Sequence, residues 1–246
     1  RATISALVEA FEHAKTFGSL IQIPSALRTH LAVLPDGLAK ARQSGDMYAT
    51  AAADDLLPLV AQALMLVMQF DAVVANPPYM GSKGMNPAWK DYARITFPDS
   101  KSDLFAMFIE RGFGWCKSTG FNSMVTMQSW MFLSSYEAMR ENLLSSKTLS
   151  NMVHMGNGVM GIAFGTAASV FWNKHLNRHE GSFSYCENDD VNADGVPRMF
   201  PVQNKRLKTA KPDDFQKIPG SPIAYWASQN TIKALNTQKI SDVAET

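Results

Sequence analysis

The sequence predicts an α/β fold with a doubly wound sheet that is preceded by a helical segment. Three observations support this. Residues 71–75 (DAVVA) are short, β-branched and apolar on both faces, as a buried parallel strand is. Strand-like and helix-like segments alternate from there to residue 172. The preceding residues carry apolar side chains at spacings of three and four, which indicates helices.

The elements follow in order. Residues 2–17 and 53–70 have helical periodicity, with Pro24, Pro35 and Gly37 between them. After the strand at 71–75 we expect a helix over 100–120, a strand over 122–132 and a helix over 134–146. Two further strands are expected at 150–156 and 166–172, joined by the glycine-rich turn GNGVMGIAFG.

Beyond residue 172 the chain becomes polar, with loop-like stretches at 188–195 and 205–214. The stretch PGSPIAYW at 219–226 resembles a turn that docks on the core. We therefore expect three parts: a helical segment at 1–70, the α/β core at 71–175 and an irregular extension at 176–246.

Composition excludes several classes of protein. A net charge of +1 gives no general basic field for nucleic acid, so contacts with it must be local. Cys116 and Cys186 are too few for a disulfide framework or zinc cluster, which favours a reduced, cytoplasmic setting. No apolar run is expected to reach the roughly 20 residues of a membrane span. His175 and His179 lack a third ligand in any known motif, so no metal site is expected.

The corner Asn76-Pro77-Pro78-Tyr79 ends the first predicted strand. Asn76 and Pro77 both precede a proline and are pushed towards extended conformations, and neither proline has an N–H. The Asn76 amide oxygen and the Pro77 carbonyl are thus two acceptors close together, and Tyr79 adds a flat ring. Ligands of doubly wound sheets bind beyond the carboxyl ends of strands. The corner therefore suits a planar molecule that carries an –NH₂ group.

NPPY after an apolar strand resembles the catalytic motif of amino-group methyltransferases that use S-adenosylmethionine (SAM). With NPPYMGSKGMN, the block FPDSKSDLFAMFIERGFGWCKSTGFN, MVTMQSWMFLSSYEAMREN, MVHMGNGVMGIAFGTAASVF and DFQKIPGSPIAYW, the chain resembles the adenine-specific DNA methyltransferases of BREX phage-defence systems (the PglX type) over residues 70–226. The large fused restriction–modification enzymes are similar more distantly. The resemblance implies the carboxyl-terminal half of a SAM-methyltransferase sheet.

The resemblance also implies roles for residues. Asn76 and the Pro77 carbonyl would accept the N6 hydrogens of a flipped-out adenine, and Tyr79 would stack on the base. The second stacking position falls on Met160, with Phe164 as the alternative. Asn76, Asp103 and Phe105 would border the cofactor, although Asp103 has an equally good interpretation as a helix cap.

Four basic residues would contact the backbone of double-stranded DNA from a loop over it: Lys83, Lys90, Arg94 and Lys101. Their alternative interpretation is a solvated loop. No glycine-rich SAM loop precedes Asn76, so the resemblance places that loop upstream of Arg1 and a DNA-recognition domain beyond Thr246. Other defence-system proteins are further expected partners.

Two alternatives stay open. One is a glutamine or ribosomal-RNA methyltransferase with the same motif, which would lack the long block at 102–130. The other is a catalytically silent DNA-recognition or assembly module of a defence complex. The target DNA sequence, the oligomeric state and a fused nuclease are beyond what the sequence predicts.

Overall fold

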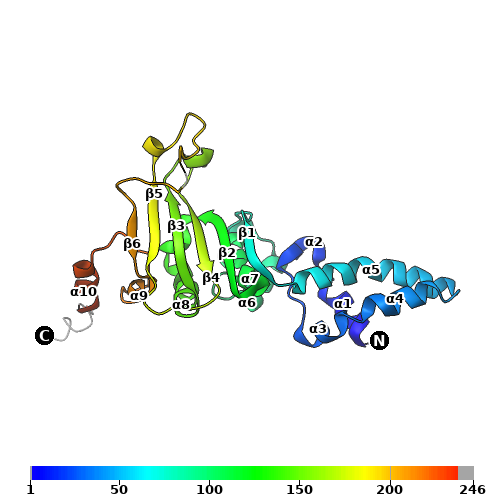
Figure 1. The fold of residues 1–246 in the computed structure, drawn as a ribbon. Coiled ribbons are helices and arrows are strands. Elements are labelled where there is room, and N and C mark those ends of the chain that lie inside the picture. Colours follow the sequence, from blue (N-terminus) through cyan, green and yellow to red (C-terminus); the bar gives the residue numbers. More distant parts are fainter. Residues whose placement is uncertain (1, 200, 238–246) are drawn as a thin grey trace. The chain divides into compact units, whose positions relative to one another are not determined.

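The structure is a computed structural model that describes residues 2–199 and 201–237, and the chain divides into two compact units (Figure 1). The first unit covers Arg1–Gln69 and the second Phe70–Thr246. Each unit has its own hydrophobic core.

The first unit is entirely helical in its described residues, as the periodicity predicts. Its core is formed by apolar side chains that include Leu7, Leu31 and Val60. The longest helix is capped by Asp46, whose carboxylate accepts hydrogen bonds from two backbone amides of the first turn. The elements are α1 (Ala2–Ala10), α2 (Ala14–Phe17), η1 (Gly18–Leu20), α3 (Ser25–Leu31), α4 (Leu34–Arg42) and α5 (Met47–Val67).

Helix α5 is long and apolar enough to cross a membrane, judged by length and composition alone. The expectation that no apolar run reaches that length was therefore wrong. Core helices of soluble proteins share this length and composition. Here α5 packs Ala53, Val60 and Ala63 into the helical core, and Asp54 forms an ion pair with Arg42 at 2.7 Å.

The second unit is built on a six-stranded sheet with the order β1-β2-β4-β3-β5-β6 (Figure 1). Strands β1, β2, β3 and β5 run parallel to one another, whereas β4 and β6 run antiparallel to their neighbours. The turn between β3 and β4 is too short for a parallel crossover, so β4 returns alongside β3. The strands are β1 (Phe70–Ala75), β2 (Cys116–Met127), β3 (Thr148–Met155), β4 (Thr166–Trp172), β5 (Gly181–Cys186) and β6 (Lys208–Ala210).

Helices accompany the sheet. Helix α7 contacts β1 and β2, and α8 contacts β3. The helices and strands share one core, which contains Phe105 of α7, Phe171 of β4 and Trp130 from the turn after β2. The remaining elements are η2 (Ser82–Gly84), α6 (Pro87–Thr96), α7 (Leu104–Trp115), η3 (Gln128–Met131), η4 (Ser134–Tyr136), α8 (Glu137–Ser146), η5 (Val159–Gly161), η6 (Asn188–Asp190), α9 (Pro212–Phe215) and α10 (Gln229–Thr237).

The structure corrects three boundaries. Helix α7 ends at Trp115, and Gly120 belongs to β2 rather than stopping a helix. A Cβ on Gly120 would lie 2.8 Å from the Phe70 carbonyl oxygen, so this glycine permits the close approach of β1. Residues 128–131 form a 3₁₀ turn instead of the end of a strand. The supposedly irregular stretch from 176 onwards contains β5 and β6, which extend the sheet.

Candidate active site at the carboxyl end of strand β1

The corner follows β1 directly, at the edge of the sheet where the parallel strands end. Asn76 and Pro78 are exposed, Pro77 is buried, and Tyr79 is half-buried. The chain therefore holds the middle of the corner in the protein while the Asn76 side chain reaches solvent. This arrangement presents a polar side chain from a rigid support.

Tyr79 is tied to Asn76 and to the neighbouring strand. Its hydroxyl lies 3.2 Å from Asn76 Oδ1 and 3.3 Å from the Val125 carbonyl oxygen, and it donates towards both. Burial and the Asp103 carboxylate raise the pKa of Tyr79 above its ordinary value. The hydroxyl thus stays protonated at neutral pH and orients the Asn76 amide.

Asp103 anchors the corner to α7. Its Oδ1 accepts from the Met80 amide at 2.9 Å and from the Phe105 amide at 3.3 Å, so one oxygen both caps the helix and holds the residue after Tyr79. Burial raises the pKa of Asp103, against the lowering effect of the three backbone amides beside it. Backbone hydrogen bonds between Met80 and Leu104 and between Ser82 and Ser102 complete the junction.

Phe105 was expected to border a cofactor, but its side chain is 0% exposed and lies in the core. It contacts the Tyr79 ring edge-on, with centroids 5.9 Å apart. The side chain therefore supports Tyr79 from behind, and the cofactor role of Phe105 stays a prediction.

The two candidates for the second stacking residue differ in position. Phe164 contacts Tyr79 directly, with ring centroids 5.8 Å apart and an interplanar angle of 61°. Met160 is half-exposed and sits in η5 with a left-handed backbone (φ 56°), held by a hydrogen bond from its amide to the Gly195 carbonyl. The geometry brings Phe164 to the corner.

The four basic residues near the corner are all exposed. Lys90 and Arg94 were expected on a loop, but they lie on α6, whose first turn is capped by Asn86. They lie one turn apart and share a face of that helix. Arg94 also forms an ion pair with Asp91 at 3.1 Å. Lys83 lies in η2, and Lys101 lies in the turn before α7.

A chain of hydrogen-bonded polar side chains, not predicted from the sequence, lies at the same end of the sheet. Gln128, the first residue after β2, contacts His154 Nε2 through Oε1 at 2.5 Å, and His154 Nδ1 lies 3.0 Å from the Tyr225 hydroxyl. The available signal was a polar residue directly after a strand, which is also what distinguishes Asn76. Among the described residues, no group of three or more His, Cys, Asp or Glu side chains could hold a metal.

The donor set around the corner decides how a SAM cofactor fits. Asn76 presents an exposed polar side chain at the carboxyl end of β1, which suits one edge of such a ligand. Asp103 Oδ1 and the Phe105 ring hold the corner in place, and their predicted position beside the cofactor stays a prediction. Within the described residues β1 is also an edge strand, and Val74 is 77% exposed. The residues present therefore fit one side of a cofactor site, beside an unpaired strand edge.

Comparison with known proteins gives consistent matches. Residues 9–160 match the protein family described as Eco57I restriction-modification methylase. The chain is 45% identical over 222 residues to the adenine-specific methyltransferase BrxX of Escherichia coli O9:H4 (strain HS), which covers 89% of this chain and 18% of that protein. It is 36% identical over 189 residues to the adenine-specific methyltransferase PglX of Lacticaseibacillus casei (strain Zhang), covering 74% of this chain and 16% of that protein.

The fold also matches a solved structure from a type I restriction–modification system, described in work on its complex assembly and conformational transition. The TM-score is 0.50 at 15% identity, over 72% of this chain and 42% of that chain. This likeness concerns the fold alone. The chain spans less than a fifth of the length of the curated relatives it matches.

Proposed function

Since the chain belongs to the Eco57I restriction-modification methylase family and resembles BREX-type adenine-specific methyltransferases, we propose that it is the catalytic-corner segment of a site-specific DNA methyltransferase. The full-length protein would methylate the exocyclic N6 of adenine, to mark self DNA in phage defence. The observation that carries this proposal is the Asn76–Tyr79 corner, which presents an oriented amide oxygen at the carboxyl end of β1.

The corner's residues have direct chemical roles in this proposal. The Asn76 amide oxygen and the Pro77 carbonyl accept the two N6 hydrogens of a flipped-out adenine, which aims the nitrogen lone pair towards the methyl donor. SAM, when bound, supplies the methyl group. No strong general base is needed, because the amine becomes acidic only as it is methylated. Asn76 borders the cofactor, and the main SAM-binding loop belongs to the full-length protein.

Tyr79 stacks on the base and Phe164 forms its second wall. The contact between their rings supports this pairing over one with Met160. A base that enters between the two rings must displace Phe164 from its present edge-on contact. Phe164 follows the glycine-rich η5 turn, where glycines at 158 and 161 have positive φ, so the backbone there has the freedom for such a movement.

Double-stranded DNA is the proposed partner, in a reduced, cytoplasmic setting. Lys83, Lys90, Arg94 and Lys101 are exposed around the corner, so they can reach phosphates without disturbing the core. Other defence-system proteins remain proposed partners of the full-length protein.

The test is Asn76→Ala in the full-length protein, with Asn230→Ala on the exposed face of α10 as the matched control. Asn76→Ala should lower the methyl-transfer rate by about 10²–10³ while SAM and DNA binding stay nearly intact, since the substitution removes an oriented hydrogen-bond acceptor. Activity within a few-fold of wild type would overturn the assignment. Absence of SAM binding by the wild-type protein would favour the alternative of a silent recognition module.

A further inference from the structure

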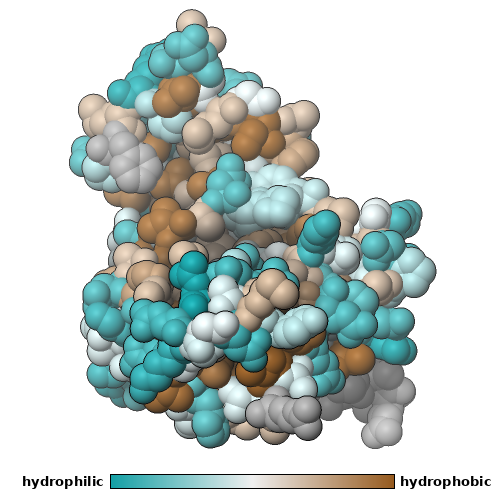
Figure 2. All heavy atoms as spheres, turned by 90° about the vertical axis from the view of Figure 1, so that its right-hand side faces the viewer, coloured by the Kyte–Doolittle hydropathy of each residue, from teal (hydrophilic) through white to brown (hydrophobic). Residues whose placement is uncertain are grey.

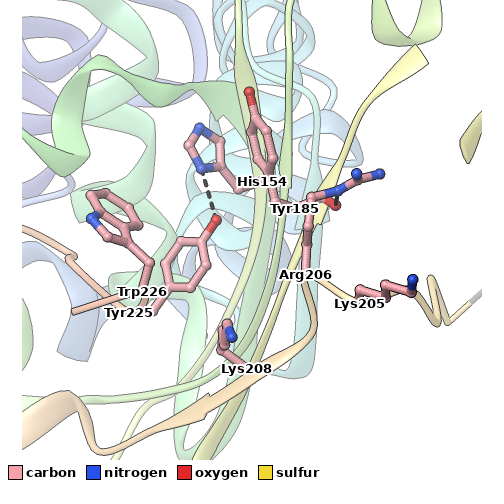
Figure 3. A pocket seen from close by; sticks show the side chains of 7 residues that line it. All are labelled: His154, Tyr185, Lys205, Arg206, Lys208, Tyr225 and Trp226. Atoms are coloured by element: carbon pink, nitrogen blue, oxygen red, sulfur yellow. Dashed lines mark hydrogen bonds between the residues drawn. The ribbon is translucent and has the colours of Figure 1, made fainter. Parts of the chain in front are cut away.

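A second pocket opens at the same edge of the sheet as the catalytic corner. Because β1, β2, β3 and β5 run parallel, their carboxyl ends meet there. His154 and Tyr185 are the next-to-last residues of β3 and β5, and both line a cavity of about 430 Å³ (Figure 3). This volume lies in the range of small-molecule sites.

The walls of the pocket are aromatic. Tyr225 is 5% exposed and stacks on Phe183, with centroids 5.2 Å apart and planes 11° apart. The next residue, Trp226, is 53% exposed and meets Tyr225 edge-on at 5.0 Å. Figure 3 shows the Tyr225 hydroxyl pointing at His154, with Trp226 beside it. The pocket thus combines a fixed floor with one broad, accessible ring.

The segment that carries these rings is held firmly. Arg140 is 1% exposed and donates to the carbonyl oxygens of Gly220 and Ser221, and the Ile223 amide donates to the Met131 carbonyl at 3.0 Å. Trp226 therefore stands on a preorganised turn, which lowers the entropic cost of using it as a binding surface.

Positive charge lies at the rim and not on the floor. Lys205 and Lys208 are exposed, and neither forms an ion pair or a side-chain hydrogen bond within residues 2–199 and 201–237. The third basic residue, Arg206, is bound by Glu187, Asp189 and Asp190, so its charge is compensated. The two lysines are available to an anion.

His154 makes the floor neutral. Burial lowers the pKa of its imidazole to about 4, and burial raises the pKa of the Tyr225 hydroxyl, so Tyr225 donates to Nδ1. The Nε2–H then donates to Gln128 Oε1. A neutral aromatic floor below two cations suits a planar base that carries a phosphate.

Gln128 links the pocket to the corner. The backbone N–H of Gln128 donates to the Gly165 carbonyl at 3.1 Å. Gly165 follows Phe164, whose ring contacts Tyr79. A Cβ on Gly165 would lie 2.4 Å from the Gln128 side-chain amide, so a larger residue there would push the Gln128 side chain out of its present position. The pocket and the corner are therefore joined by a short series of packed groups.

We propose that this pocket binds one unstacked nucleotide of a DNA strand, with the base against Trp226 and the phosphate at Lys205 and Lys208. This inference rests on the proposed function, because a protein that flips an adenine disturbs the neighbouring stack and needs a place to hold it. An aromatic platform with cations beside it is the usual means of binding unstacked bases without reading their sequence. The pocket would hold the DNA open while the adenine occupies the corner.

The test measures binding of a fluorescein-labelled single strand of twelve thymidines to the full-length protein by anisotropy, over a series of salt concentrations. Trp226→Ala should weaken binding roughly 5- to 150-fold, the equivalent of removing one base stack, and Trp226→Phe should restore most of it. The Lys205→Ala/Lys208→Ala double variant should reduce the slope of log affinity against log salt by about 0.7 for each phosphate that is no longer neutralised. Lys174→Ala, an exposed lysine after β4 at the opposite edge of the sheet, is the matched control.

Unchanged affinity in Trp226→Ala, or an unchanged salt slope in the lysine variant, would overturn the proposal. Variants that bind the oligonucleotide normally but no longer bind another protein would also overturn it. The methylation assay of Asn76→Ala tests the role of the corner separately from nucleotide binding in the pocket. Loss of methylation in Asn76→Ala together with unaltered oligonucleotide binding in Trp226→Ala would leave the methyltransferase function standing and refute only the pocket.

Discussion

The hydroxyl and the ring of Tyr79 have separable roles, which Tyr79→Phe and Tyr79→Ala distinguish. The hydroxyl hydrogen bonds, at 3.2 Å to Asn76 Oδ1 and 3.3 Å to the Val125 carbonyl, are longer than the usual 2.7–2.8 Å of an O–H···O bond. A bond of this kind contributes about 1 kcal/mol at most. Tyr79→Phe should therefore slow methyl transfer by only about fivefold.

Removal of the ring should cost more. A stacked base is worth about 1–3 kcal/mol, so Tyr79→Ala should slow transfer roughly 5- to 150-fold through the absence of stacking alone. The edge-on contacts of Tyr79 with Phe105 and Phe164 would also disappear, which loosens the corner further.

The assay is single-turnover transfer of a radiolabelled methyl group from SAM to DNA by the full-length protein. Tyr48→Ala, at an exposed tyrosine of the helical unit, is the control. Because the pKa of Tyr79 is raised above 10, the ratio between Tyr79→Phe and wild type should not change between about pH 7 and pH 9. Equal losses in the Phe and Ala variants would refute the stacking role and assign the function to the hydroxyl.

Three other predictions concern stability and support, each measured on the full-length protein. Arg140→Met should destabilise the second unit by about 3 kcal/mol or more in chemical unfolding, because carbonyls of Trp130, Leu133, Gly220 and Ser221 lose a buried donor; a loss no larger than that of an exposed arginine would contradict this. Asp103→Ala should cost about 1–2 kcal/mol and reduce methylation, whereas Asp103→Asn keeps an acceptor oxygen and should be milder; equal effects would show that the charge matters. Folding lowers the pKa of His154 from 6.5 to about 4, so the unfolded chain binds more protons between these pH values. The free energy of unfolding should therefore fall by about 3 kcal/mol as the pH drops from 6.5 to 4. His154→Asn should remove this pH dependence in thermal unfolding, and a dependence that persists in the variant would implicate another group.

Local patterns predicted much of the architecture. The helical periodicity of residues 1–70 and the strands at 71–75, 150–156 and 166–172 correspond to described elements, because their signals lie within a few turns or alternations of the chain. Local sequence patterns failed to predict the secondary structure where pairing between strands determined it. Residues 116–120 look like the end of a helix but belong to β2. Cys116 pairs with Phe70 of β1, and the register shifts before Phe121 pairs with Ala72. The segment GSFSYC has weak strand character, yet it becomes β5 because β3 offers it a parallel edge.

The corner itself was visible in the sequence because Asn76, Pro77, Pro78 and Tyr79 are adjacent, and their backbone restrictions act between neighbours. The distribution of hydrophilic and hydrophobic side chains over the surface was not visible in the sequence (Figure 2). Nor was the choice of Phe164 over Met160, or the engagement of Asp103 with both Met80 and Phe105, because these depend on how a later loop packs against the corner.

The sequence by itself determined the family, the position of the Asn76–Tyr79 corner after β1 and the helical nature of the first unit. Only the tertiary structure decided the second pocket. Its residues come from β3, β5, β6, the segment before β6 and the turn between α9 and α10, and they lie up to 72 positions apart in the chain. Hydrophobic packing brings these residues together, and Tyr225 donates a hydrogen bond to the one acceptor nitrogen of the neutral His154 ring. Both contacts depend on which residues are buried side by side, and a short stretch of sequence does not show that.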